Sequence, residues 1–252
     1  MWKLRGLGKL KIIRLVVKFM MGLWFWHGRV HTIKRGPLKG YKWSCNKHHQ
    51  FWMPLGVYEM ETAGWIIDQC SEGSVFFDVG GNAGYFTLIG SKAVGDGQVI
   101  VFEPISANVQ TIHEHIKHNG CKNICVEEMA VSDESGTIDF VVESNNANSH
   151  IAEVKISHAK TNPDQVIQVP MMRLDDYIAE KGLDPNVVKV DVEGAELKVL
   201  RGAEACLKRK QASWIISTHS QKLFDDCKRV MLEFGYKVEE LEGFHHELIC
   251  TP

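Results

Sequence analysis

The segment FFDVGGNAGYFT, residues 76–87, is a short apolar run followed by a glycine-rich turn. Glycines directly after a strand let the backbone turn tightly and approach a ligand with no Cβ in the way. We expect a strand over 75–79 with Asp78 as its last outward-facing residue, and then a helix over 84–93. A carboxylate in front of the turn suits the ammonium of an amino-acid moiety and repels a pyrophosphate. The segment predicts a ligand site, and the alternative is a turn that only packs strand against helix.

The spacing of the turn's glycines differs from the dinucleotide fingerprint. Gly80 and Gly84 frame it, and the order GxGxxG is absent. Glu103 lies nineteen residues beyond Gly84, at the end of the next expected strand, and Pro104 follows it. An acid at this place can accept hydrogen bonds from both hydroxyls of a ribose. Because NAD sites use the same device, this feature alone indicates an adenosine-containing ligand.

A third expected strand, 124–127, is followed by Glu128 and Met129. In a doubly wound sheet an adenine ring would lie at this strand end. Glu128 could accept a hydrogen bond from the exocyclic amine, and Met129 could pack on the ring. A surface carboxylate and a core methionine are the equal alternative.

The segment KVDVEGAE, residues 189–196, ends a strand expected over 187–192. Its carboxylates, Asp191 and Glu193, fall on the sheet edge where open α/β sheets bind ligands. An Asp-x-Glu pair can hold a divalent ion, but the spacing shows no third ligand, so no metal site is expected. His219, after a strand at 214–218, joins Asp191 as a candidate base because imidazole titrates near neutral pH. A structural histidine at a strand end is the alternative.

Strands and helices alternate from about residue 75 onwards, and two extended pieces, 236–240 and 247–250, close the chain as a hairpin. Repeated βαβ units predict a doubly wound α/β fold: a mostly parallel, seven-stranded sheet with helices on both faces and a C-terminal antiparallel hairpin. The further helices are expected over 58–70, 106–119 with Ser106 as N-cap, 174–181, 195–208 and 222–234. The remaining strands are expected over 98–102, 137–142 and 167–171.

Four motifs occur in order along the chain: DVGGNAGYFTL, VFEP, AVSDESG and VKVDVEGAELKVLRGA. Together they resemble the FkbM-type methyltransferases over residue 75 to about 220. The resemblance implies a class I methyltransferase fold, S-adenosyl-L-methionine as cofactor, and O-methylation of a hydroxyl on a sugar, glycan or similar small molecule. It further implies that Asp191 and Glu193 lie beside the transferred methyl group, with His219 as the third catalytic candidate. The family often has Glu-x-His after the fifth strand, whereas this chain has Ser217 in place of the acid.

The candidate residues for binding S-adenosylmethionine are those of the glycine-rich segment and of the next two strand ends. They are Asp78, Gly80, Asn82, Gly84, Tyr85, Thr87, Glu103, Pro104, Glu128 and Met129. The polar, asparagine-rich stretch 143–165 is expected to be a loop. Its Asn145, Asn148 and His150 offer hydrogen-bonding groups to a polyhydroxylated acceptor, and a plain solvent-exposed loop is the alternative.

The charge of the chain is divided unevenly along its length. Residues 1–58 hold twelve Lys and Arg and no acid, while 59–252 hold 17 basic and 31 acidic residues, a net charge of −14. We divide the chain into a basic amphipathic segment, 1–28, an irregular lead-in, 29–70, and a catalytic domain, 71–252. Residues 11–26 suit peripheral membrane contact. The alternatives are packing on the catalytic domain or in a homodimer, and a cleaved signal peptide, although no small-residue cleavage site follows. Seven scattered cysteines favour a cytoplasmic protein, and residues 11–26 would place it at the inner face of a membrane. No nucleic-acid partner is expected, because the basic residues of the first segment are interleaved with aliphatic ones.

Two other classes of protein compete with the methyltransferase hypothesis. A Rossmann-type oxidoreductase would share Glu103 but should carry GxGxxG in the first turn and lack Asp78. A methyltransferase-like binding protein, or a membrane-attached scaffold without turnover, could keep the fold and lose the chemistry. The acids at Asp78, Glu103 and Asp191 argue against such a loss.

Overall fold

The computed structural model describes residues 29–45, 52–142, 150–151, 165–241 and 246–252, and the chain divides into two compact units, 1–58 and 59–252. In the first unit, β1 (Arg29–Thr32) and β2 (Lys42–Cys45) form an antiparallel hairpin, and the short helix α2 (Trp52–Leu55) follows. The sequence predicted only irregular structure here, because Gly36, Pro37 and Gly40 interrupt any longer pattern. Gly36 and Gly40 have positive φ, so they build the turn that joins the two strands.

The second unit carries the rest of the described strands and helices. The strands are β3 (Val75–Val79), β4 (Gln98–Phe102), β5 (Ile124–Glu127), β6 (Ala130–Ser132), β7 (Gly136–Val142), β8 (His150–Ile151), β9 (Gln165–Arg173), β10 (Val187–Val190), β11 (Ser213–Thr218), β12 (Lys237–Leu241) and β13 (His246–Thr251). The helices are α3 (Met60–Gln69), α4 (Tyr85–Ala93), α5 (Ser106–Asn119), α6 (Leu174–Lys181), α7 (Glu196–Arg201), α8 (Glu204–Arg209) and α9 (Gln221–Glu233).

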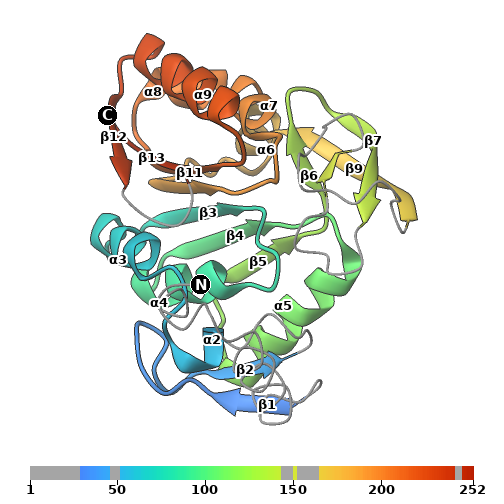
Figure 1. The fold of residues 1–252 in the computed structure, drawn as a ribbon, viewed down its shortest axis with the longest axis vertical. Coiled ribbons are helices and arrows are strands. Elements are labelled where there is room, and N and C mark those ends of the chain that lie inside the picture. Colours follow the sequence, from blue (N-terminus) through green and yellow to red (C-terminus); the bar gives the residue numbers. More distant parts are fainter. Residues whose placement is uncertain (1–28, 46–51, 143–149, 152–164, 242–245) are drawn as a thin grey trace, which may run out of the picture. The chain divides into compact units, whose positions relative to one another are not determined.

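Seven strands form one sheet in the order β12-β13-β11-β10-β3-β4-β5 (Figure 1). The neighbouring pairs from β11 to β5 are all parallel, and β13 runs antiparallel to both β11 and β12. The strand order reverses between β3 and β10, which places a topological switch point at the centre of the sheet. The predicted fold class, a mostly parallel seven-stranded sheet ending in an antiparallel hairpin, is confirmed.

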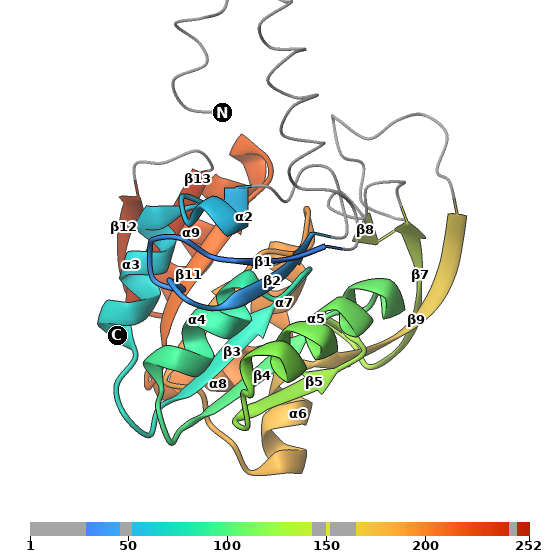
Figure 2. The same ribbon diagram turned by 90° about the horizontal axis from the view of Figure 1, so that it is seen from below.

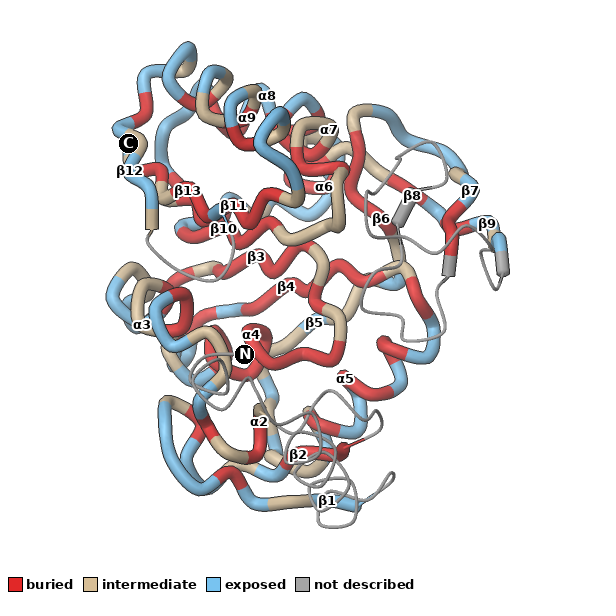
Figure 3. Tube along the Cα trace, in the orientation of Figure 1, coloured by how far each residue is buried: buried red, intermediate tan, exposed pale blue. Residues whose placement is uncertain are grey.

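Helices cover both faces of this sheet. Figure 1 shows α6 to α9 on one face and α3, α4 and α5 on the other, and Figure 2 gives the view at right angles. The central strands are buried on both faces because both are covered: Phe77 and Trp214 are fully buried on one face, and Phe76 and Ile215 on the other. Figure 3 shows the same burial along β3, β10 and β11. Because these strands are buried along their length, their packing fixes the positions at which the loops at their carboxyl ends begin.

A second sheet of four strands, in the order β6-β9-β7-β8, was not predicted. β7 and β9 pair antiparallel over seven residues, from Gly136↔Met171 to Val142↔Gln165. The sequence indicated extended structure at 137–142 and 167–171, but it did not show that the two segments pair. The expected loop 143–165 is wrong in part, because β8 lies within it and β9 begins at its last residue. The pairing of β7 with β9 places Phe140 and Val169 in a small apolar cluster.

The predicted helix 195–208 is wrong in one respect, because it consists of two helices, α7 and α8. A Cβ at Gly202, between them, would lie 1.9 Å from the carbonyl oxygen of Ser132, so the chain passes very close to β6 there. The Asp175 carboxylate then accepts hydrogen bonds from the backbone N–H groups of Ala205 and Cys206, which begins a new helix.

Two predicted boundaries also need correction. Ser106 is the first residue of α5 and not its N-cap, which is Ile105, without a side-chain cap. β10 ends at Val190, two residues before the predicted end, so Asp191 begins the loop that follows the strand.

Some expectations lie outside the described residues. They are the proposed membrane segment 11–26 and the acceptor candidates Asn145 and Asn148, and for His150 only the backbone is described. In the part of the chain that the structure describes, no helix combines the length and the apolar character needed to cross a membrane.

Candidate active site

A cleft opens at the carboxyl ends of the central strands, and about 620 Å³ of space, which includes open solvent at its mouth, lies along it. Of the residues singled out in the sequence, Gly80, Asn82, Glu103, Pro104, Met129, Asp191 and Glu193 line it. The other lining residues are Val79, Phe102, Ile105, Asn108, Ala130, Val131, Phe140, Val192 and Ala195. Strand ends at a topological switch point are where open α/β sheets bind ligands.

The glycine-rich turn forms the floor of this cleft. A Cβ at Gly80 would lie 1.9 Å from the carbonyl oxygen of Asp191, so only glycine allows the turn to approach the end of β10. The backbone N–H groups of Gly80 and Gly81 both donate to the carbonyl of Phe102, which fixes the turn against β4. Gly84 has a φ of 84° and directly precedes α4. The turn is therefore held by backbone contacts on both sides.

Glu103 is fixed at one end of the cleft by three donors. Its Oε2 accepts from the backbone N–H of Asn82 at 2.8 Å, and its Oε1 accepts from the backbone N–H of Ile105 at 3.0 Å and from Asn108 Nδ2 at 3.1 Å. The side chain is almost wholly buried. Sequence reasoning missed Asn108, because its contact with Glu103 depends on how α5 begins. A carboxylate held this way keeps one orientation, and Oε2, which accepts only one of the three bonds, can still accept from a ribose hydroxyl.

The middle of the cleft is apolar. Met129 and Val131 lie beyond the end of β5, and Phe140 comes from β7. These side chains suit the faces of a flat heterocycle such as adenine. Glu128, the second candidate at this strand end, is exposed, accepts a hydrogen bond from Ser106 Oγ and does not line the cleft.

The expectation that Asp78 faces outward is wrong, because its side chain is fully buried. Its Oδ2 accepts from Thr87 Oγ1 at 2.6 Å, and its Oδ1 lies 3.8 Å from Lys189 Nζ. Strand β3 has a neighbour on either side, and α4 covers this position through Thr87. Thr87 and Tyr85 are themselves buried. None of these three residues lines the cleft, so any effect they have on a ligand passes through other groups.

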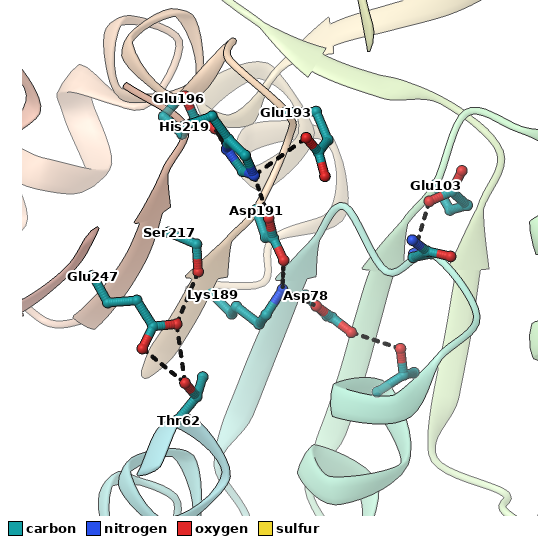
Figure 4. Close-up of polar contacts among 12 residues, drawn as sticks. Thr62, Asp78, Glu103, Lys189, Asp191, Glu193, Glu196, Ser217, His219 and Glu247 are labelled. Carbon is teal, nitrogen blue, oxygen red and sulfur yellow. Dashed lines mark hydrogen bonds and ion pairs between the residues drawn. The ribbon is translucent and has the colours of Figure 1, made fainter. Parts of the chain in front are cut away.

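Lys189 is a buried residue beside the site that the sequence reasoning missed. It is only 1% exposed, and its Nζ lies 3.1 Å from Asp191 Oδ2 and 3.8 Å from Asp78 Oδ1 (Figure 4). Burial alone would lower the pKa of its ammonium, but the two carboxylates more than offset this and raise it. The lysine within the apolar strand VVKV could have predicted an ion pair between Lys189 and a nearby acid, because a buried lysine needs a charged partner. Lys189 holds one oxygen of Asp191 and leaves the other facing His219.

His219 lies among three carboxylates. Its Nδ1 is 2.7 Å from Glu196 Oε1, and its Nε2 is 3.3 Å from Glu193 Oε2 and 3.6 Å from Asp191 Oδ1 (Figure 4). Burial lowers the pKa of this imidazole, but hydrogen bonds to Glu193 and Glu196 and the nearby charges raise it overall, to about 11. The expected titration near neutral pH is therefore wrong for the chain without ligands: His219 is then an imidazolium. The structure does bring His219, Asp191 and Glu193 together.

A carboxylate also lies beside Ser217, where the family's acid is missing from the sequence. Glu247 on β13 is the register partner of Ser217 on β11, and its Oε1 accepts from Ser217 Oγ at 3.0 Å. Thr62 Oγ1 on α3 donates to the same carboxylate at 2.9 Å. Glu247 is buried, and burial raises the pKa of its carboxyl. Only the pairing of distant strands reveals this residue, so spacing could not have predicted it.

The comparison with protein families agrees with this architecture. A model described as "Methyltransferase FkbM domain" matches residues 78–238, which is more than half of the chain. The match begins at Asp78 and includes every cleft-lining residue, because the lining runs from Val79 to Ala195.

Two individual proteins show the same relationship. "Methyltransferase 1" of Beauveria bassiana (strain ARSEF 2860) is 27% identical over 160 residues, which cover 55% of this chain and 64% of that protein. The crystal structure of methyltransferase FkbM from Methylobacillus flagellatus KT superposes with a TM-score of 0.52 at 17% identity, over 71% of this chain and 44% of the other. The chain thus spans less than two thirds of either relative. At this identity the structural match supports the fold.

The strand order, the cleft at its switch point and the family match point to one conclusion. The family match gives the cofactor of the domain as S-adenosylmethionine. The chain belongs to the methyltransferase FkbM domain family.

Proposed function

We propose that this chain methylates a hydroxyl group on a sugar, a glycan or a similar small-molecule acceptor. The observation that carries the proposal is the polar cluster of Asp191, Glu193 and His219, next to a cleft that fits the cofactor. The close approach of Gly80 to the end of β10 holds the glycine-rich turn at the border of the cleft, and Glu103 presents a fixed carboxylate. These features suit the adenosine and amino-acid parts of S-adenosylmethionine.

Each part of the cleft has its own task in this proposal. Glu103 would accept from the ribose hydroxyls, and Met129 and Phe140 would pack on the adenine. Gly80 and Asn82 would border the amino-acid part. Bound S-adenosylmethionine supplies a methyl group on an electrophilic sulfonium. The main work of the chain is then to hold the acceptor oxygen in line with that methyl group.

The acidic cluster is suited to a neutral hydroxyl. Asp191 Oδ1 and Glu193 Oε2 are both acceptors on the rim of the cleft, so either can take the O–H hydrogen bond and direct the oxygen's lone pair. Asp191 is the better base, because His219 already carries a proton in the chain without ligands. A base within hydrogen-bond reach contributes about 10²- to 10⁴-fold to the rate. An anionic acceptor would meet the repulsion of these carboxylates.

A panel of acceptors tests the proposal. The purified chain would be incubated with S-adenosylmethionine and polyhydroxylated sugars, glycans or small molecules, and release of S-adenosylhomocysteine would be measured. Each active acceptor would be paired with its deoxy analogue, and the methylated atom would be located by NMR. We expect methyl on oxygen and no reaction with the deoxy analogue. Methyl on nitrogen, carbon or a carboxylate would overturn the proposal.

A binding protein without turnover is the competing function. Its cofactor pocket could be the same, but binding the cofactor alone does not require that a buried lysine orient Asp191. Multiple turnovers of S-adenosylmethionine with any acceptor would exclude it.

A further inference from the structure

We infer that Asp191, Glu193 and His219 bind a divalent cation of the Mn²⁺ or Mg²⁺ class. One ligand atom from each of the three side chains can be chosen so that all lie within 4.8 Å of one another. Asp191 and Glu193 follow β10, and His219 follows β11, its parallel neighbour in the sheet. The sequence showed only the Asp-x-Glu pair, and the third ligand comes from the next strand.

The distances suit such a cation. Around an octahedral ion with bonds of about 2.1 Å, adjacent ligand atoms lie about 3.0 Å apart and opposite ones about 4.2 Å apart. His219 Nε2 lies 3.3 Å from Glu193 Oε2 and 3.6 Å from Asp191 Oδ1. Adjustments of a few tenths of an ångström would bring His219 Nε2 to the adjacent-ligand distance from both carboxylate oxygens, and all three ligand atoms already lie within 4.8 Å of one another. Asp191 and Glu193 border the cleft, which leaves the remaining coordination positions to water or a ligand.

The contact behind the histidine is an independent indication. Metal-binding histidines commonly donate their second ring N–H to a carboxylate, which fixes the ring and its tautomer. Glu196 is fully buried, and its Oε1 lies 2.7 Å from His219 Nδ1. The same oxygen also accepts from the backbone N–H of Gly194. Glu196 therefore holds the ring with Nε2 directed between Asp191 and Glu193, as Figure 4 shows.

The charges around the site also favour a cation. Four carboxylates, those of Asp78, Asp191, Glu193 and Glu196, contact Lys189 or His219 in the described part of the chain. The single ammonium of Lys189 is outnumbered by these four carboxyl groups, so the surroundings of Asp191 and Glu193 favour a divalent cation.

The role of the cation rests on the proposed function, although its binding does not. A cation held by these three side chains would bind the acceptor's hydroxyl oxygen directly and orient it toward the cleft, with the side chains acting as ligands. Glu196 would then be a positioning residue, which acts through His219.

Titration of the full chain with MnCl₂ tests the inference, without cofactor or acceptor, by calorimetry and by the EPR signal of free Mn²⁺. We expect one site per chain. Glu193→Gln and His219→Gln should each weaken binding at least tenfold, and Glu196→Gln by about 10- to 100-fold. Glu134→Gln, an exposed acid on the turn before β7, is the matched control and should bind as the unsubstituted chain does.

Circular dichroism of each variant would show that it is folded. Glu193 is partly exposed, so its variant tests the site even if removing the buried Glu196 charge unfolds the chain. Absence of Mn²⁺ binding, or binding that Glu193→Gln and His219→Gln leave unchanged, would overturn the inference. Because no methyl transfer is measured, this failure is distinct from a failure of the proposed function.

Discussion

Replacing Glu103 with glutamine should weaken binding of S-adenosylmethionine strongly while changing the shape of the side chain very little. Both carboxylate oxygens of Glu103 accept from the chain: Oε2 from Asn82, and Oε1 from Ile105 and Asn108. In Glu103→Gln, one oxygen becomes an NH₂ group. Whichever way the amide turns, this NH₂ points at a backbone N–H, so one donor faces another.

The size of the effect follows from the lost charge and the lost acceptor. A hydrogen bond to a charged group contributes about 1.5–3 kcal/mol, and the variant loses at least one such bond to the ribose. This corresponds to a dissociation constant about 10- to 150-fold larger. The donor-to-donor contact should also lower the free energy of unfolding by about 1–3 kcal/mol.

Calorimetric titration with S-adenosylmethionine measures the first effect, and urea unfolding measures the second. Glu134→Gln is the control again, because its side chain is exposed and lies outside the cleft. If the dissociation constant of Glu103→Gln for the cofactor is within twofold of that of the unsubstituted chain, then Glu103 does not bind the ribose and our account of the cleft is wrong.

Three further substitutions test other parts of the site. Lys189→Met leaves the carboxylates of Asp78 and Asp191 without their cation, so we expect it to lower the free energy of unfolding by about 3–5 kcal/mol, measured in urea. A decrease of less than about 1 kcal/mol would contradict a stabilising ion pair at Lys189. The pKa of His219 is raised from 6.5 to about 11, so its contacts stabilise the fold fully below about pH 6.5 and cease to do so as the pH rises through 11. His219→Gln should therefore cost more stability near pH 6 than near pH 10, and an equal cost at both would refute the shift. Gly80→Ala places a Cβ 1.9 Å from the carbonyl of Asp191 and should weaken cofactor binding at least tenfold, whereas Gly182→Ala, with nothing within 4 Å, should not.

Local patterns were enough to predict most of the large sheet. β3, β4, β5 and α6 have the predicted boundaries, because each is a short periodic segment bounded by glycine or polar residues. The closing hairpin was predicted for the same reason. Glu103 and Asp191 could be placed at the cleft because parallel strands bring their carboxyl ends to one edge.

The parts that could not be predicted depend on contacts between distant segments. The pairing of β7 with β9 joins residues on either side of a long polar stretch. Glu247 reaches Ser217 only because β13 inserts between β11 and β12. The pKa of His219 depends on carboxylates from another strand end and from a helix. Asp78 was expected to face outward toward a ligand because strand position alone does not show that α4 covers it.

A crystal structure of the chain with S-adenosylhomocysteine would test the central claim most directly. We expect the ribose hydroxyls within hydrogen-bond distance of Glu103, the adenine against Met129 and Phe140, and the sulfur directed toward Asp191 and Glu193. A ligand bound outside this cleft, or a sulfur directed away from the acidic cluster, would contradict the account.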